Sequence, residues 1–268
     1  MQILPTQFKP SKKQTEILIL LYRFRFLNRH QIQTILSHKY RSRVLSWLNE
    51  LVEQKYITAC YDKKLAALPT VYCLDNEGRK YLKSLDNETE AGNIDLALLN
   101  RVWREKKFTK QFREHCLFVA DIYLNLLDLA KEWKSELQFR TKVDLYNIEG
   151  MIKPGPDIYF SLKYPEGEAK RYLLDIFDDI PPAAIRKRVK DYLEYYDNDE
   201  WQNNTDKSFP EIILICPNKR IKGHLYYFIL KKRWDDTEPA FYLAIKDFVK
   251  TKGLNSSVLE KVEERDDN

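Results

Sequence analysis

An almost wholly apolar run, Glu211-Ile-Ile-Leu-Ile-Cys216, constrains the fold of the C-terminal half more than any other segment. Because apolar and polar residues do not alternate in it, the run predicts a β-strand buried on both faces, as strands of parallel sheets are. Pro181-Pro182 begins a predicted helix that ends near residue 196, and another helix is predicted at about residues 221–231. We therefore expect a sheet with both faces covered by helices.

Other elements flank this run in a recognisable order. A long amphipathic helix is predicted at residues 107–133, and the polar tail after Gly253 predicts a frayed end. The remaining strands are predicted at residues 136–146, 157–162, 172–177 and 240–244. The order helix, three strands, helix, strand looks like the PD-(D/E)XK nuclease core. The expected fold class of this half is therefore α+β or α/β, with a restriction-endonuclease-like mixed sheet flanked by helices.

The N-terminal part has a different pattern. Ser11 begins a helix with Ser11 or Thr15 as its possible cap, Asn28 caps a second helix at residues 29–36, and a third helix is predicted at about residues 40–54. Two strands follow, at residues 56–60 and 70–74, with a polar tip between them. Three helices followed by a two-stranded ribbon form the layout of a winged helix-turn-helix. This segment resembles the winged-helix domains of bacterial transcription and plasmid regulators.

A polar, charged connection at residues 84–107 separates the two patterns. Such stretches are typical of domain boundaries, and we place the boundary near residue 90. The sequence therefore predicts a winged helix-turn-helix DNA-binding domain at residues 1–90 and a PD-(D/E)XK nuclease-like domain at residues 91–268.

The net charge of +5 is unevenly distributed along the chain: residues 1–84 contain 15 Lys and Arg against 6 Asp and Glu, a net +9, and the remainder carries −4. A basic block of this kind is typical of a module that binds a polyanion, and double-stranded DNA is the expected partner. In a winged helix, the third helix enters the major groove and the wing touches phosphate. The residues predicted to bind DNA are Lys39, Arg41, Ser42, Arg43, Lys63 and Lys64. The alternative is a solvated basic surface on a winged helix that binds proteins or dimerises.

Several classes of protein are not indicated. No apolar run approaches the roughly 18 residues that a membrane span needs, and no secretory signal is visible, so no membrane partner is expected. The four cysteines lack paired spacing, and the four histidines show no ligand spacing with them, which disfavours a zinc site. Reduced, buried cysteines are typical of a cytoplasmic protein.

Two acidic residues mark a candidate catalytic site. Asp157, after Pro156, opens one predicted strand, and Asp175 lies inside the next. Two carboxylates on neighbouring strands can hold a divalent metal through hard oxygen ligands, so both are candidate Mg²⁺ ligands. Glu136 is expected as a third acid near the same edge of the sheet. A Lys two residues after Asp175 would complete a nuclease signature, but Phe177 occupies that position.

A basic residue from elsewhere could replace the missing Lys. The helix predicted after Asp175 carries Arg186, Lys187, Arg188 and Lys190, and Lys187 is the candidate we assign to the site. Lys153, ahead of Pro156, is another candidate. The competing interpretation is that the helix residues form a solvated basic face.

Short motifs in a fixed order connect the chain to a known family. They are His115 with Val119-Ala-Asp121-Ile, Trp133-Lys-Ser-Glu136, Pro156-Asp157, Leu174-Asp175, Tyr192-Leu-Glu-Tyr195-Tyr196 and Phe209-Pro210-Glu-Ile-Ile-Leu-Ile. With the N-terminal winged helix, the chain resembles the replication-relaxation family of plasmids and conjugative or integrative elements over most of residues 12–230. That family has Leu-Glu where this chain has Leu174-Asp175. It has an acid at the position of Phe177, which this chain has lost.

Three functions follow from these patterns. The leading hypothesis is a DNA-binding accessory or regulatory protein of a plasmid or mobile element, acting in replication, relaxation, mobilisation or transcription control. Its nuclease-like domain would be degenerate and not catalytic. The first alternative is an active Mg²⁺-dependent DNA endonuclease whose basic residue has migrated, and only this one requires a cofactor. The second is a protein-interaction module that pairs with another copy or with a mobile-element protein.

Overall fold

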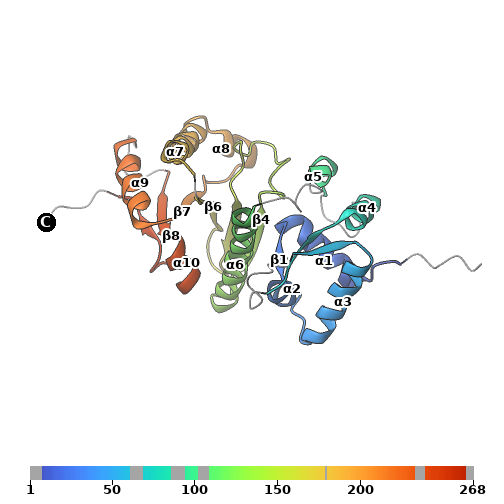
Figure 1. Cartoon of the computed structure of the whole chain (residues 1–268). Helices are drawn as coiled ribbons and strands as arrows, with labels where there is room; N and C mark the ends of the chain where they lie inside the picture. Colours follow the sequence, from blue (N-terminus) through green and yellow to red (C-terminus); the bar gives the residue numbers. More distant parts are fainter. Residues whose placement is uncertain are drawn as a thin grey trace, which may run out of the picture. The chain divides into compact units, whose positions relative to one another are not determined.

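The computed structural model describes residues 8–60, 69–85, 94–101, 109–178, 180–232 and 239–263. The chain divides into two compact units, residues 1–120 and 121–268, each with its own sheet (Figure 1). This division lies within helix α6 (Lys110–Glu132). The boundary expected near residue 90 lies outside the described residues, and the assignment of residues 1–90 and 91–268 to two functional domains stays a prediction.

The first unit contains five short helices, the beginning of α6 and a small sheet within its described residues. Its elements are α1 (Lys12–Phe24), β1 (Leu27–Asn28), α2 (Arg29–Ile35), α3 (Arg41–Glu53), β2 (Ile57–Cys60), β3 (Val71–Leu74), α4 (Asn76–Ser84) and α5 (Leu96–Arg101). The strands pair antiparallel in the order β1-β3-β2. β1 was not predicted, because two residues are too few to show an alternation of polar and apolar side chains.

Local sequence explains where the first helices begin. The Ser11 hydroxyl accepts a hydrogen bond from the Gln14 N–H, and the Gln14 side chain accepts one from the Ser11 N–H. Asn28 and Gln31 form the same reciprocal pair at the start of α2. Such capping boxes satisfy backbone donors that a helix N-terminus leaves without partners, so both predicted caps are confirmed.

Gly78 allows α4 to approach the preceding segment closely. A Cβ atom at this position would lie 2.2 Å from the backbone oxygen of Tyr56. That oxygen accepts a hydrogen bond from the Asp75 N–H at the start of α4, 2.9 Å away. Any larger residue would therefore push the helix away from the end of α3 and the start of β2.

The second unit is a six-stranded mixed sheet covered by helices, as the sequence predicts in outline (Figure 1). Its strands are β4 (Glu136–Thr141), β5 (Ile158–Lys163), β6 (Lys170–Ile176), β7 (Glu211–Cys216), β8 (Phe241–Ile245) and β9 (Glu260–Lys261). They lie side by side in that order, parallel for β6-β7-β8 and antiparallel elsewhere. The apolar run forms β7 with the predicted bounds and lies inside the sheet.

Helices pack on both faces of this sheet. The remaining helices of the unit are α7 (Pro182–Asp197), α8 (Glu200–Thr205), α9 (Lys219–Lys232) and α10 (Lys246–Lys252). Tyr159, Leu173 and Ile212 belong to one buried cluster with side chains of α7, α8 and α9. On the opposite face, the Tyr123 ring of α6 lies 4.7 Å from the ring of Phe139 in β4. Alternating side chains along each strand supply these two faces.

Two predictions about this unit are wrong in detail. The first strand ends at Thr141 and not near residue 146, because the Asp144 carboxylate accepts hydrogen bonds from the N–H and hydroxyl of Thr141 and closes a turn. The tail after Gly253 is not frayed as far as residue 263. Leu254, Val258 and Val262 are buried there, and the short strand β9 pairs with β8.

Candidate functional site

Asp157 and Asp175 meet at one end of the sheet, as the sequence predicts. Asp157 immediately precedes β5, and Asp175 lies in the neighbouring strand β6. The Asp157 N–H donates to Asp175 Oδ1 at 3.2 Å, and the Ile176 N–H donates to Asp157 Oδ2 at 3.0 Å. Each carboxylate therefore accepts a backbone hydrogen bond from the other's strand, which joins the start of β5 to β6.

Arg188 and Tyr192 of α7 complete the surroundings of Asp175. Arg188 Nε donates to Asp175 Oδ2 at 2.6 Å, and the Tyr192 hydroxyl donates to the same oxygen at 2.8 Å. Arg188 also donates to the carbonyl of Pro154 at 2.6 Å and to the Tyr192 hydroxyl at 2.9 Å. Asp175 is only 6% exposed and Arg188 only 9%. This is a buried ion pair in which each nitrogen of the Arg188 guanidinium donates a hydrogen bond.

Burial and the ion pair act on the same titratable groups. Burial alone would lower the pKa of Arg188, but the charge of Asp175 outweighs it and raises that pKa above its ordinary value. Burial raises the pKa of Tyr192, and the neighbouring Asp175 carboxylate raises it further. Arg188 therefore stays charged and Tyr192 stays neutral at any ordinary pH.

Asp157 is the more accessible of the two acids. Its Oδ1 lies 3.3 Å from Nζ of Lys142, whose own side chain is mostly exposed. Lys142 follows directly after β4, and its backbone N–H donates to the Asp157 carbonyl. Lys142 is not among the predicted site residues, because it belongs to a turn within a segment predicted as strand.

The two aspartates do not fit a Mg²⁺ ion in this arrangement. A hard cation needs carboxylate lone pairs directed at it. Here each of the four oxygens of Asp157 and Asp175 faces a protein donor, and one of those donors is the permanently charged Arg188. Within the described parts of the chain, no cluster of three or more His, Cys, Asp or Glu side chains is arranged to hold a metal.

The basic residue of α7 that reaches the acid pair is Arg188, and not the predicted Lys187. Lys187 is exposed on α7, and Lys153 lies at the surface with its Nζ 3.2 Å from the carbonyl of Tyr146. Successive residues of a helix point about 100° apart, so neighbours cannot share one direction. Arg188 lies in the stripe of Ile185, Val189 and Tyr192 that faces the core. That spacing is visible in the sequence and could have identified it.

Glu136 does not lie near the acid pair, contrary to expectation. In the antiparallel pairing of β4 with β5, Glu136 is opposite Lys163, whereas Thr141 is opposite Ile158, the neighbour of Asp157. Five strand residues correspond to about 17 Å. Glu136 is therefore at the other end of the same sheet face, and its predicted part in catalysis has no geometric support.

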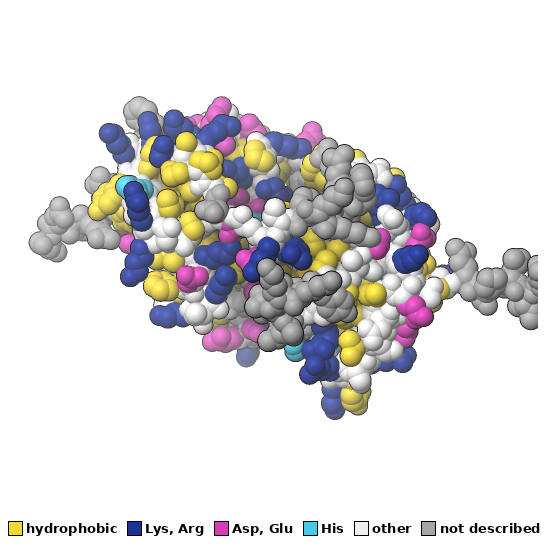
Figure 2. Space-filling view, viewed as in Figure 1, with side chains coloured by type: hydrophobic (Ala, Val, Ile, Leu, Met, Phe, Trp, Pro, Cys, Tyr) yellow, Lys and Arg dark blue, Asp and Glu magenta, His cyan; other side chains and the backbone are white. Residues whose placement is uncertain are grey.

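The predicted DNA-contacting residues of α3 lie at the surface. Lys39, Arg41, Ser42 and Arg43 are all exposed, whereas Val44, Trp47 and Leu48 of the same helix are buried. Arg43 lies over the ring of Trp47, with 5.6 Å from Cζ to the ring centroid. In Figure 2, Lys and Arg side chains gather over the end of α3 at the bottom of the view. Lys63 and Lys64 lie outside the described residues.

A family model described as Replication-relaxation matches residues 18–212. The chain belongs to the replication-relaxation family. The matched region of this family member includes α3, Asp157, Asp175, Arg188 and Tyr192. Membership supports a role related to the replication or relaxation of a plasmid or mobile element. No functionally curated protein and no solved structure matches the chain.

Phe177 lies two residues after Asp175, at the position where a nuclease signature would have Lys. Its side chain is buried in the cluster that includes Ile185 and Val189 of α7, and its N–H donates to the carbonyl of Ile215. The side chain of Phe177 is therefore part of the core of the second unit. Among the residues that the structure describes, no helix has both the length and the apolarity to cross a membrane.

Proposed function

We propose that this member of the replication-relaxation family binds double-stranded DNA through a winged helix, and that its second unit is a nuclease-like scaffold that does not cleave. The observation that carries the proposal is the exposed basic surface at the start of α3, formed by Lys39 just before the helix and by Arg41, Ser42 and Arg43 in its first turn. These residues project from a helix whose other side is buried. Such a helix can enter a major groove without disturbing the core of its unit.

The arrangement around α3 supports the winged-helix interpretation. A four-residue turn separates α2 from the cap residue of α3, and the strands β2 and β3 then pair as an antiparallel ribbon. β1 adds a third strand beside β3. In this interpretation α3 is the recognition helix and the connection between β2 and β3 is the wing, so Lys63 and Lys64 remain the predicted wing contacts to phosphate.

The environment of Asp175 supports a scaffold that does not cleave. The order β4-β5-β6-α7-β7 supports the predicted PD-(D/E)XK arrangement, in which Asp157 and Asp175 would be the two acids. Arg188 and Tyr192 both donate hydrogen bonds to Oδ2 of Asp175, and Phe177 supplies no charge. A fully neutralised acid pair favours a structural role over hydrolysis of a phosphodiester.

Binding to duplex DNA at several salt concentrations tests the first part of the proposal. Arg41→Ala combined with Arg43→Ala should weaken binding at least about tenfold and lower the salt slope by roughly 2, because two phosphate-neutralising charges are lost. Lys219→Ala combined with Arg220→Ala removes the same charge from the exposed start of α9 and serves as the matched control. Equal losses in both variants would show that α3 is not the recognition helix.

Lys142 favours one competing function. Its ammonium group beside Asp157 could act as the migrated basic group of an active endonuclease. The DNA from the binding experiment, incubated with the wild-type protein and Mg²⁺ or Mn²⁺, should stay intact. Cleavage that disappears in both Asp157→Ala and Lys142→Ala would replace our proposal with the endonuclease. A stable dimer without affinity for DNA in a light-scattering measurement would instead favour the protein-interaction module.

A further inference from the structure

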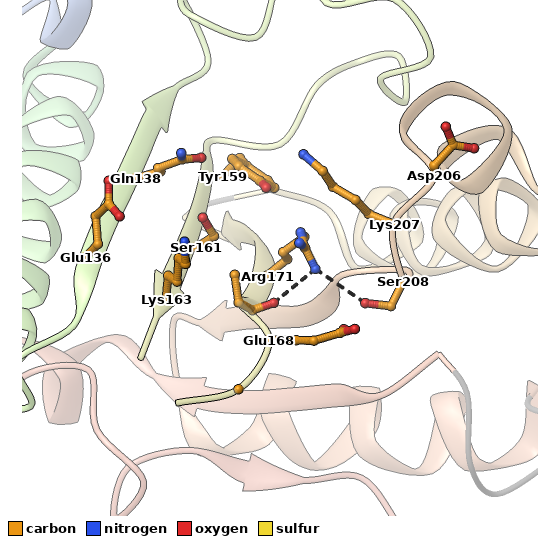
Figure 3. Close-up of a pocket in the computed structure, with 12 residues that line it drawn as sticks. Glu136, Gln138, Tyr159, Ser161, Lys163, Glu168, Arg171, Asp206, Lys207 and Ser208 are labelled. Atoms are coloured by element: carbon orange, nitrogen blue, oxygen red, sulfur yellow. Dashed lines mark hydrogen bonds between the residues drawn. The ribbon is translucent and has the colours of Figure 1, made fainter. Parts of the chain in front are cut away.

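A polar cavity lies on the same sheet face as the acid pair, toward the opposite end of the strands. Its volume is about 460 Å³. The strands β4, β5 and β6 form its floor, and the loops around Glu168 and Lys207 form its sides (Figure 3). The cavity belongs entirely to the second unit, and none of the residues proposed to contact duplex DNA contributes to it.

One side of the cavity is built to hold an anion. Arg171 is fixed by hydrogen bonds from its Nη1 to the carbonyl of Ala169, at 3.0 Å, and to the hydroxyl of Ser208, at 3.5 Å (Figure 3). Lys163 and Lys207 line the same space. Within the described part of the chain, none of these three cations forms an ion pair with a carboxylate. A guanidinium held in place with donors to spare suits a phosphate group.

A serine hydroxyl on the floor has no hydrogen-bond partner among the described residues. Ser161 lies in β5 and is only 5% exposed, yet its side chain lines the cavity. No hydrogen bond joins its hydroxyl to another described residue, so the hydroxyl can bond a group inside the cavity. Ser161 is directly opposite Arg171 in β6 and opposite Gln138 in β4. We therefore expect the Ser161 hydroxyl to bond a ligand or solvent that lies between Arg171 and Gln138.

The other side of the cavity carries hydrogen-bond acceptors. Glu136 and Gln138 are two residues apart in β4, so their side chains share the face that bounds the cavity. Glu accepts a hydrogen bond from the amino group of cytosine, and Gln can pair with the amino edge of adenine. Gln138 and Arg171 are separated by two strand spacings, about 10 Å. A nucleotide with its phosphate at one side and its base at the other can bridge that separation.

We propose that this cavity binds one nucleotide with an amino-bearing base. Arg171, Lys207 and Ser208 hold the phosphate, and Glu136 and Gln138 contact the base edge. The same chemistry is present in a mononucleotide and in the terminal nucleotide of a DNA strand. The site needs neither the winged helix nor metal binding at Asp157 and Asp175, so it can be tested apart from the function proposed above.

Calorimetric titration of the full chain tests the assignment. The ligands are dCMP, dAMP, dTMP, deoxycytidine and inorganic phosphate, with a 5′-phosphorylated single-stranded oligonucleotide to distinguish a strand end from a mononucleotide. We expect dCMP or dAMP to bind at least about tenfold more tightly than dTMP, deoxycytidine or phosphate. Tighter binding of the oligonucleotide than of dCMP would identify the strand end as the source, and the reverse order would identify the mononucleotide.

Substitutions of cavity residues test whether the nucleotide binds in this cavity. Arg171→Gln with Lys207→Ala should weaken nucleotide binding at least about tenfold, and Glu136→Ala should bring the affinities for dCMP and dTMP closer together. Arg186→Gln with Lys190→Ala removes an Arg and a Lys from exposed positions of α7 and should leave binding unchanged. Thermal unfolding shows whether each variant folds, and Arg171→Lys keeps the charge if Arg171→Gln does not fold.

Three results would overturn the proposal: no heat of binding with any nucleotide, equal affinity for phosphate and dCMP, or full binding by the folded Arg171 and Lys207 variant. Arg41→Ala with Arg43→Ala should leave nucleotide binding unchanged. Failure of the cavity proposal and failure of the DNA-binding proposal therefore give different results.

Discussion

Among the described residues, charged side chains are paired at one end of a face of the six-stranded sheet and unpaired at the other end. At the Asp157 end, Asp175 and Arg188 are buried and every carboxylate oxygen faces a donor. At the Arg171 end, three cations and three acids surround an open cavity without pairing to one another. Both ends are built from the same strands, β5 and β6, and from side chains of the same parity.

This difference indicates what each end contributes. Buried charges that satisfy one another hold secondary-structure elements in register, because removing either partner leaves a charge in a poor solvent. Charges around a cavity add little to stability, since water already solvates them. We therefore expect the Asp157 end to support the fold and the Arg171 end to bind a ligand. Substitutions at the two ends should separate stability from binding.

Removing Arg188 should produce the largest loss of stability. Arg188→Ala leaves Asp175 buried without its counter-ion, and we expect the free energy of unfolding to fall by about 3–5 kcal/mol. Urea denaturation followed by circular dichroism measures it. Lys187→Ala is the matched control, because it changes the next residue of the same helix at an exposed position, and its effect should stay within about 0.5 kcal/mol.

A double variant distinguishes an unpaired charge from lost packing. Arg188→Met with Asp175→Leu removes both charges and keeps apolar volume, so it should recover much of the loss caused by Arg188→Ala. A loss for Arg188→Ala no greater than that for Lys187→Ala would contradict the view that this ion pair supports the fold.

The sequence predicted most elements of the fold because their patterns are local. The apolar run Glu211–Cys216, the caps Ser11 and Asn28, and the long helix α6 each depend on neighbouring residues. The meeting of Asp157 with Asp175 was also predictable, because consecutive strands commonly pair.

The composition of the site depended on features that are not local. Glu136 was misplaced because the direction and register of β4 relative to β5 decide which ends meet, and neither can be read from a single strand. Arg188 was passed over for Lys187 because charged residues are expected at the surface of a helix. Its position in the buried stripe of α7 was the signal against that expectation. The cavity at Arg171 needed three strands and two loops to be brought together.

The ionisation of Tyr192 should make the stability of the Asp157 end depend on pH. Its neutral phenol donates to the buried Asp175, so Tyr192→Phe should cost about 1.5–3 kcal/mol near neutral pH. The pKa of Tyr192 is raised in the folded protein by burial and by Asp175, whereas an unfolded Tyr ionises near pH 10. Its contribution to stability is therefore complete below about pH 10 and is lost as the pH rises further.

Denaturation curves at several pH values between 7 and 11 measure this effect. Wild-type stability should decrease above about pH 10, and the gap between wild type and Tyr192→Phe should narrow there. Other tyrosines with raised pKa values, such as Tyr172, are present in both proteins and cancel in the difference. A gap that stays constant up to pH 11 would show that Tyr192 is not held as a neutral donor.

Arg171 should give the smallest change in stability. Its guanidinium is half-exposed and bonds only the carbonyl of Ala169 and the hydroxyl of Ser208 among the described residues, so Arg171→Gln should cost no more than about 1 kcal/mol in urea denaturation without ligand. A cost near that of Arg188→Ala would show that both ends of the face are structural. With saturating dCMP, wild type should gain stability and Arg171→Gln should gain much less, because only a ligand bound to the folded state shifts unfolding. The same substitution thus separates the contribution of Arg171 to stability from its contribution to ligand binding.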